Sequence, residues 1–309
     1  MLEKARASTS NCEQRLDDMR DFSRIQSTQV TPAVRRLNAE LERCRRNESL
    51  IREAINRAEE QRLIIRNGED ERVLVAALSA FKNVQQIRLM RNMDRFDEQW
   101  QNFLNTNHTL RSEFGASRWT ASCERATMVL GRAYLASGST AHRISSRFMD
   151  PSPEWLQNYI SQEAISSLST RLTCLELQID HPSDLNEKMS RLSDVFRTVF
   201  TAAVKMEGLH IGLRRPISIP LESIFHEVTW PRLLYMGFSR WNISSDEVIQ
   251  FIHRHRSSLR SLRFREVRLT KGKWIEIIKF LRQELNLKWA SFRQVGYEPR
   301  LGGGTYIGE

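Results

Sequence analysis

Apolar positions in the C-terminal half of the chain recur with one spacing, L-x-x-L-x-F-x-x-V-x-L. The stretch HRSSLRSLRFREVRL, which ends at Leu269, shows this spacing most clearly. Copies of it begin at Leu172, Met206, Leu233, Leu259 and Leu287, and an isolated earlier copy begins at Val84. The last three intervals are 27, 26 and 28 residues long. Each copy predicts a short strand whose alternate side chains enter a core.

Amphipathic segments separate these copies, and they predict helices. PLESIFHEV, SSDEVIQFIHRH and KWIEIIKFLRQEL place apolar residues three and four positions apart. Ser244 and Glu247 have the spacing of a capping box, which predicts a helix that begins next to Ser244. Strand and helix therefore alternate with a period of about 26 to 28 residues, within the range of leucine-rich repeats. We expect an α/β fold, a leucine-rich-repeat-like solenoid with a curved parallel sheet, preceded by a helical N-terminal region.

The remaining segments divide the chain into four expected parts. Residues 1–46 are polar and contain Pro32, so we expect a helical or partly disordered arm. Residues 47–160 read as a helical region with one early strand at about 84–90, in which Asn67 and Gly68 stop a helix. We expect an exposed Ser-rich loop over residues 137–146. The solenoid occupies residues 161–299, and a Gly-rich flexible tail occupies residues 300–309.

Composition adds a positive charge without changing the fold class. The 309 residues carry a formal net charge of +10, and residues 254–273 hold eight basic residues against one acid, Glu266. Such a patch favours acidic partners or phosphate. No apolar run is long enough to cross a bilayer and no signal peptide is recognisable, so we expect a cytoplasmic or nuclear protein with no membrane partner. The four cysteines fit neither a disulfide framework nor a zinc site, so we expect mostly buried thiols.

The sequence contains no recognisable catalytic motif. The phosphate-binding glycine loops and the nucleophile elbow are absent, and His226-Glu227 lacks a second histidine four positions after the first. His253 and His255 do not share a helix face, so we interpret both as solvated residues at a helix end. We therefore expect no enzyme activity, no metal site and no cofactor.

Alternation along each strand assigns the side chains that point away from the helices. On the last four strands this pattern selects seven candidate partner-binding residues, His210, Tyr235, Ser239, Arg263, Arg265, Trp289 and Arg293. Arginines on a strand can also serve solubility alone, by covering their neighbours with their stems. A cluster on adjacent strands is harder to explain in that way, because like charges repel one another unless an anion or an acidic partner is present.

Several segments resemble the C-terminal body of fungal F-box and leucine-rich-repeat-like proteins. They are the stretch from Leu41 to Arg91, RISSRFMDP, SIPLESIFHEVTW and SLRSLRFREVRL, so the resemblance extends from about Leu41 to Tyr297. It implies a substrate receptor, whose F-box docks onto the adaptor subunit of a cullin-based ubiquitin ligase while the repeats select the target. TPAVRRLNAELERC lacks the opening Leu-Pro and the apolar pattern of an F-box. The F-box therefore either lies upstream of this sequence or is absent from this member.

These observations predict a non-enzymatic protein-interaction module that binds an acidic protein or peptide on the concave face of its curved sheet. Contact with a ubiquitin-ligase adaptor follows only if an upstream F-box exists. The alternative is a nucleic-acid-binding or scaffold protein that uses the basic patch at 254–273. Nucleic-acid binding is the weaker expectation, because only Tyr235 and Trp289 are placed for base stacking and no motif for reading bases is present.

Overall fold

The computed structural model describes residues 2–26, 31–90, 95–107, 117–181 and 184–297. Contacts divide the chain into two compact units. The first comprises Met1–Asp70 and Asn92–Phe114, and the second comprises Glu71–Arg91 and Gly115–Glu309.

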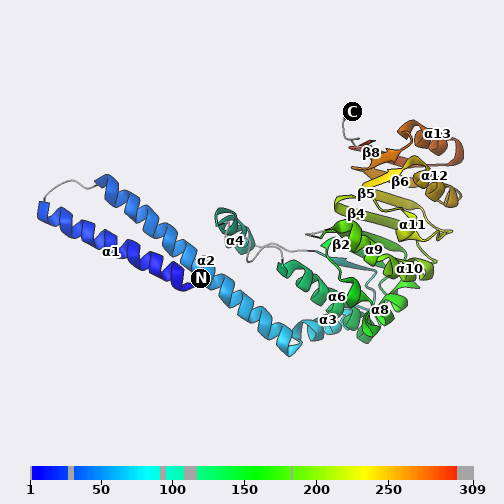
Figure 1. The fold of residues 1–309 in the computed structure, drawn as a ribbon. Coiled ribbons are helices and arrows are strands. Elements are labelled where there is room, and N and C mark those ends of the chain that lie inside the picture. The colour runs from blue at the N-terminus through cyan, green and yellow to red at the C-terminus, as the bar shows by residue number, and fades with distance from the viewer. Residues whose placement is uncertain (1, 27–30, 91–94, 108–116, 182–183, 298–309) are drawn as a thin grey trace. The chain divides into compact units, whose positions relative to one another are not determined.

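The first unit is helical. It contains α1 (Leu2–Gln26), α2 (Thr31–Asn67) and α4 (Arg95–Thr106). Helices α1 and α2 lie side by side as a hairpin (Figure 1), and Arg45 of α2 pairs with Glu13 of α1 at 2.9 Å. Pro32 lies in the first turn of α2, where a missing N–H is tolerated. The helix continues past residue 46 and ends before Gly68, whose φ of +63° suits a helix C-terminus, as the sequence predicted.

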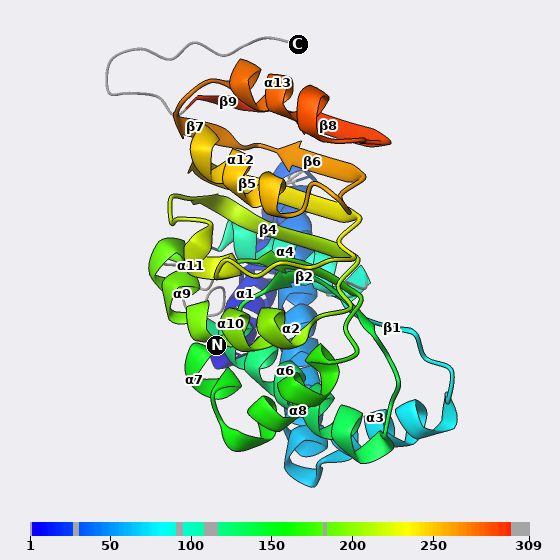
Figure 2. The ribbon, with the colours of Figure 1, turned by 90° about the vertical axis from the view of Figure 1, so that its right-hand side faces the viewer.

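The second unit is built on an open parallel sheet. Its main path follows the chain in the order β1-β2-β3-β4-β5-β6-β8, and the short strands β7 and β9 continue the pairing beyond β5. The strands are β1 (Gln86–Leu89), β2 (Arg143–Met149), β3 (Cys174–Ile179), β4 (Gly208–Ile217), β5 (Tyr235–Ser244), β6 (Ser261–Arg265), β7 (Arg268–Lys271), β8 (Trp289–Arg293) and β9 (Gly296–Tyr297). Figure 2 shows β4, β5, β6 and β8 following one another.

Helix α3 (Glu69–Ala80) leads into β1. Helices between later strands lie along one face of this sheet (Figure 2). They are α6 (Ser117–Ser137), α7 (Pro153–Leu156), α8 (Tyr159–Ser169), α9 (Leu185–Arg191), α10 (Ser193–Ala202), α11 (Glu222–Phe225), α12 (Ser245–Arg254) and α13 (Trp274–Glu284). The capping box of Ser244 and Glu247 at the start of α12 is present, as the sequence predicted. These observations confirm an α/β fold with a parallel sheet.

The core lies between the sheet and its helices, because equivalent apolar residues align across the strands. Leu209 pairs in register with Met236 on β5, and Met236 pairs with Leu262 on β6. All three side chains are fully buried. The aromatic rings of Phe238 and Phe264 stack at 5.5 Å in the neighbouring row. The apolar spacing in the sequence therefore marks the inner face of the sheet correctly.

Two local expectations were wrong. Residues 143–149 form β2, and Ser145 and Ser146 are buried rather than part of an exposed loop. The strand is held by pairing to β1 and β3 on both sides, which its own polar sequence does not reveal. His255 is buried rather than solvated, since its ring stacks on Trp230 at 5.3 Å and its Nδ1 lies 2.9 Å from the carbonyl of Phe251. The expected tail at 300–309 lies outside the described residues.

All four cysteines are free thiols. Cys12 and Cys123 are buried, whereas Cys44 and Cys174 are partly exposed. The Sγ atoms of Cys12 and Cys44 lie 3.8 Å apart between α1 and α2. Burial raises the pKa of the Cys123 thiol and that of Cys174, which disfavours the reactive thiolate at both positions.

Candidate functional site

The sheet face opposite the helices carries three rows of mainly polar or small residues, and we call this surface the polar face. Strand register places the rows without ambiguity. From β3 to β8 the rows are Cys174-Gly208-Tyr235-Ser261-Trp289, Glu176-His210-Gly237-Arg263-Ser291 and Gln178-Gly212-Ser239-Arg265-Arg293. All seven residues that alternation selected lie on this one face.

The arginines gather on the last two strands of the main sheet. Arg265 on β6 pairs in register with Arg293 on β8, and Arg263 precedes Arg265 on the same face. Strands of a sheet are separated by about 4.8 Å, so like charges at paired positions repel one another. Arg265 has a carboxylate partner, Glu266, at 3.2 Å. Within the described part of the chain, Arg263 and Arg293 form no ion pair.

Glu266 does not neutralise the cluster, because another arginine also binds it. The Nε atom of Arg240 donates a hydrogen bond of 2.6 Å to Glu266. That hydrogen bond lowers the pKa of the Glu266 carboxyl, and the charges of Arg240 and Arg265 act in the same direction. One carboxylate therefore serves two arginines, and the polar face keeps a net positive charge between β6 and β8.

His210 is the most buried of the seven candidate residues, at 6% exposed. Its ring occupies the space above Gly237 on the next strand, where an added Cβ would come within 2.1 Å of Nδ1. Nδ1 has no hydrogen-bond partner in the described structure. Burial lowers the pKa of His210 to about 4, and the charges of Arg263 and Arg265 add to this effect while Glu176 opposes it. The imidazole is therefore neutral at physiological pH.

Tyr235 and Arg263 lie next to this histidine. An added Cβ at Gly237 would also lie 2.9 Å from the Tyr235 hydroxyl, so Tyr235 and His210 border the same glycine. Burial raises the pKa of Tyr235, although a hydrogen bond with the Arg263 side chain acts in the opposite direction. The hydroxyl thus stays protonated at neutral pH and can donate to an anion. Together these side chains offer hydrogen-bond donors beside unpaired positive charge.

The other candidate residues extend the surface rather than joining this group. Ser239 is buried at 7% exposed and follows Gly237 by two residues on β5. Trp289 is 47% exposed and shares a row with Tyr235, with Ser261 between them. Two strand spacings amount to about 10 Å, so the two aromatic rings can contact different parts of one extended partner.

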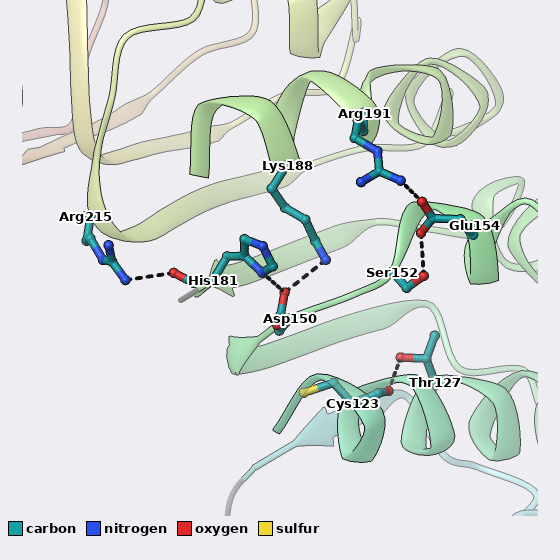
Figure 3. A network of polar contacts seen from close by, with 9 residues as sticks. All are labelled: Cys123, Thr127, Asp150, Ser152, Glu154, His181, Lys188, Arg191 and Arg215. Atoms are coloured by element: carbon teal, nitrogen blue, oxygen red, sulfur yellow. Dashed lines mark hydrogen bonds and ion pairs between the residues drawn. The ribbon is translucent and has the colours of Figure 1, made fainter. Parts of the chain in front are cut away.

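A second polar cluster lies where β2 and β3 end, and sequence reasoning missed it (Figure 3). Asp150 is fully buried, and its Oδ1 lies 2.9 Å from Nζ of Lys188 and 2.9 Å from Nδ1 of His181. Arg215 donates a hydrogen bond of 3.0 Å to the carbonyl of His181. The only signal in the sequence is that Asp150 and His181 each come soon after a strand, where side chains from adjacent parallel strands meet.

This cluster is built as a structural anchor. The buried ion pair joins the end of β2 to Lys188 of α9, which is itself only 5% exposed. Cys123 is drawn beside it in Figure 3, but burial raises its pKa and so keeps it a thiol. Among the residues that the structure describes, no group of three or more His, Cys, Asp or Glu side chains is placed to hold a metal ion.

None of the helices in the described ranges is long and apolar enough to cross a membrane. Comparisons with protein-family models, with curated proteins and with solved structures find no match.

Proposed function

We propose that this chain is a non-enzymatic protein-interaction module of the leucine-rich-repeat type, and that its polar face binds an acidic segment of another protein. Support for the repeat architecture comes from the order of the strands. Each strand of the main path pairs with the next one along the chain, and positions separated by 26 to 28 residues pair in register from β4 to β8. In repeat proteins, the exposed strand face is a common binding surface.

The observation that carries the acidic-partner proposal is the unpaired charge of Arg263 and Arg293. Arg263 lies two residues before Arg265 on β6, and Arg293 pairs in register with Arg265 from β8; within the described chain neither Arg263 nor Arg293 has a carboxylate partner. An acidic segment laid across β5, β6 and β8 would accept hydrogen bonds from the guanidinium groups. Tyr235 and Trp289 supply the aromatic contacts that, with arginine, dominate protein interfaces.

The alternative of a nucleic-acid interface has less support. A phosphate-binding track needs many basic residues on one surface. Of the basic residues in 254–273, Arg263 and Arg265 lie on the polar face, whereas Arg254 is on helix α12 and pairs with Glu222 at 2.6 Å. Arg260 donates to backbone carbonyls, including that of Leu259 at 2.8 Å. The patch is therefore continuous in the sequence but not on one surface.

We further propose that the module serves as the substrate-recognition part of a ubiquitin-ligase receptor, as the resemblance to the F-box and leucine-rich-repeat-like family implies. The test is affinity purification of the chain from its native cell, alongside a version extended upstream if the gene encodes one. Recovery of the ligase adaptor and cullin with the extended form supports this role. If neither form recovers ligase subunits, the receptor role is wrong and an interaction scaffold remains.

The binding surface is tested separately with defined probes. A fluorescein-labelled peptide rich in Asp and Glu and a single-stranded oligonucleotide of equal charge are titrated with the protein at 50 and at 200 mM salt. We expect tighter binding of the peptide at both salt concentrations. Tighter binding of the oligonucleotide, with an affinity that falls 100-fold or more between the two concentrations, would instead indicate a phosphate-binding surface.

A further inference from the structure

Two of the four cysteines face each other across the N-terminal helical hairpin, in a part of the chain that the proposed function does not use. Cys12 lies on α1 and Cys44 lies on α2, where the two helices run side by side (Figure 1). Their Sγ atoms are 3.8 Å apart, although the residues are separated by 32 positions in the chain. The S–S distance of a disulfide is about 2.05 Å, so the two sulfurs need to approach by roughly 1.8 Å for a bond to form.

Small residues on α1 allow this close approach of the two helices. Ser8 and Thr9 lie four and three positions before Cys12, so they share its side of the helix. Thr9 and Cys12 are buried, at 7% and 3% exposed. The Ser8 hydroxyl lies 3.5 Å from Sγ of Cys44 and can donate a hydrogen bond to that sulfur. The Cys44 side chain is therefore directed at α1, next to both Ser8 and Cys12.

The two thiols differ in their access to solvent. Burial raises the pKa of the Cys12 thiol, and the neighbouring Cys44 acts in the same direction. Cys44 is partly exposed, so an oxidant in solution reaches it before it reaches Cys12. A Cys44 sulfur that has been oxidised then finds the Cys12 thiol 3.8 Å away. This arrangement favours a bond within one chain over a bond between two chains.

The polar contacts that hold the hairpin together beside the two cysteines are weak. Arg45 of α2 pairs with Glu13 of α1, and Arg15 of α1 pairs with Glu40 of α2 at 3.9 Å. These four side chains are between 39% and 53% exposed, and exposed ion pairs contribute little to stability. A disulfide at this place would close a loop of the chain and so restrict the unfolded ensemble. Oxidation should therefore make the hairpin open less often.

We propose that Cys12 and Cys44 are a reversible oxidation site, at which a peroxide forms a disulfide that locks the α1–α2 hairpin. The Cys44 sulfur attacks one oxygen of hydrogen peroxide and the O–O bond breaks, so that Cys44 becomes a sulfenic acid and one water leaves. The Cys12 sulfur then attacks the Cys44 sulfur, the S–S bond forms, the S–O bond breaks, and a second water leaves. The two thiol protons end on these waters, so two thiols are oxidised and one peroxide is reduced.

Reduced glutathione reverses the reaction by thiol–disulfide exchange. Two glutathione molecules restore the two thiols and are themselves oxidised to glutathione disulfide. The site is independent of the polar face and of the function proposed for it.

The test treats the full-length protein with hydrogen peroxide, alkylates the remaining thiols under denaturing conditions, and identifies linked peptides by mass spectrometry. We expect the peptide that contains Cys12 to be joined to the peptide that contains Cys44, in protein that is still monomeric. Burial raises the pKa of the thiols of Cys123 and Cys174, so both should still be alkylated. Reduced glutathione should restore all four thiols. Amide hydrogen exchange in α1 should be at least tenfold slower in the linked form than in the reduced form.

Two serine variants separate this pair from cysteine oxidation in general. Cys44→Ser should form no link and should leave Cys12 a free thiol at the same peroxide dose, because Cys12 is buried. Cys174→Ser is the matched control, since it removes a partly exposed cysteine of the other unit, and it should form the link at the wild-type rate. Circular dichroism checks that both variants are folded.

Three results would overturn the proposal. The first is a wild-type Cys44 that is oxidised to a sulfinic acid without forming a link to Cys12, or that links two molecules instead. The second is a pair of free thiols after a peroxide dose that oxidises an equal concentration of glutathione. The third is unchanged amide exchange in α1 once the link has formed, which would show that the bond does not lock the hairpin.

Discussion

Nδ1 of His210 occupies the space that a side chain at position 237 would need, since a Cβ built on Gly237 would lie only 2.1 Å away. The two residues are partners in register on β4 and β5. The absence of a side chain at Gly237 thus leaves room for the imidazole to be buried in the polar face. This burial keeps His210 neutral at physiological pH. The arginines beside it gain a neutral neighbour instead of another cation.

This relationship predicts the effect of a single added methyl group. Gly237→Ala should destabilise the protein by roughly 1–3 kcal/mol, because the ring must move out of its place. Its displacement into solvent should also raise the pKa of His210 toward the ordinary value. Urea unfolding measures the first effect and NMR titration of the imidazole the second. Gly296→Ala is the control, because no atom lies within 4 Å of the added Cβ there, and it should change stability by less than about 0.5 kcal/mol.

His210 should also make stability depend on pH. Its pKa is about 4 in the folded protein, against an ordinary value of 6.5, so unfolding takes up a proton between these pH values. Stability from this group is therefore present above pH 6.5 and falls as the pH decreases toward 4, by roughly 3 kcal/mol in total. The buried His255, whose pKa burial also lowers, acts in the same direction.

Urea unfolding between pH 7.5 and 4.5 measures this dependence. The His210→Asn variant should show a shallower loss of stability over that range than the wild type. His253→Asn, in which an exposed histidine on the last turn of α12 is replaced, should keep the wild-type slope. Identical slopes for the wild type and His210→Asn would contradict the assigned burial of the ring.

The buried pair of Asp150 and Lys188 should be far more important for stability than an exposed pair. Removing one partner leaves a charge without compensation in the core, so Lys188→Met should cost about 3–5 kcal/mol. Arg214→Met breaks the ion pair with Asp180, where the arginine side chain is 60% exposed, and should cost less than about 1 kcal/mol. Chemical denaturation of both variants checks the difference. Equal losses would show that Asp150 is solvated.

The capping box at the start of α12 gives a prediction that rests on sequence and structure together. The Ser244 hydroxyl accepts a hydrogen bond of 3.2 Å from the Glu247 N–H, and the Glu247 carboxylate accepts one of 2.9 Å from the Ser244 N–H. Ser244→Ala should therefore destabilise the protein by about 1 kcal/mol in thermal or urea unfolding. Ser257→Ala, at an exposed position after the same helix, is the control and should leave stability within about 0.5 kcal/mol.

The strands, their inner faces and the polar face were predictable because they depend on local alternation and on one repeat length. Leu262 and Phe264 face the core, whereas Arg263 faces away, simply because strand side chains alternate. The same rule placed His210 and Tyr235 on one face. It did not reveal that His210 is buried, since that depends on Gly237, which lies on the next strand.

The parts that were missed depend on contacts between distant residues. Asp150 and His181 are 31 positions apart in the chain and meet only because β2 and β3 are neighbours. Strand β2 has few apolar residues and forms because strands on both sides supply its hydrogen bonds. Burial of His255 likewise requires Trp230 of the preceding repeat. No local sequence pattern predicts these contacts.

The central claim is that Arg263, Arg265 and Arg293 bind an acidic partner on the polar face, and fluorescence anisotropy with the labelled Asp- and Glu-rich peptide tests it most directly. The test variant replaces these three arginines with serine. The control replaces Arg256, Lys279 and Arg282, which lie on or after the helices α12 and α13, and so changes the net charge equally. We expect the test variant to bind at least tenfold more weakly and the control to bind within twofold of the wild type. Equal weakening in both variants would mean that net charge alone attracts the peptide, and would contradict the claim.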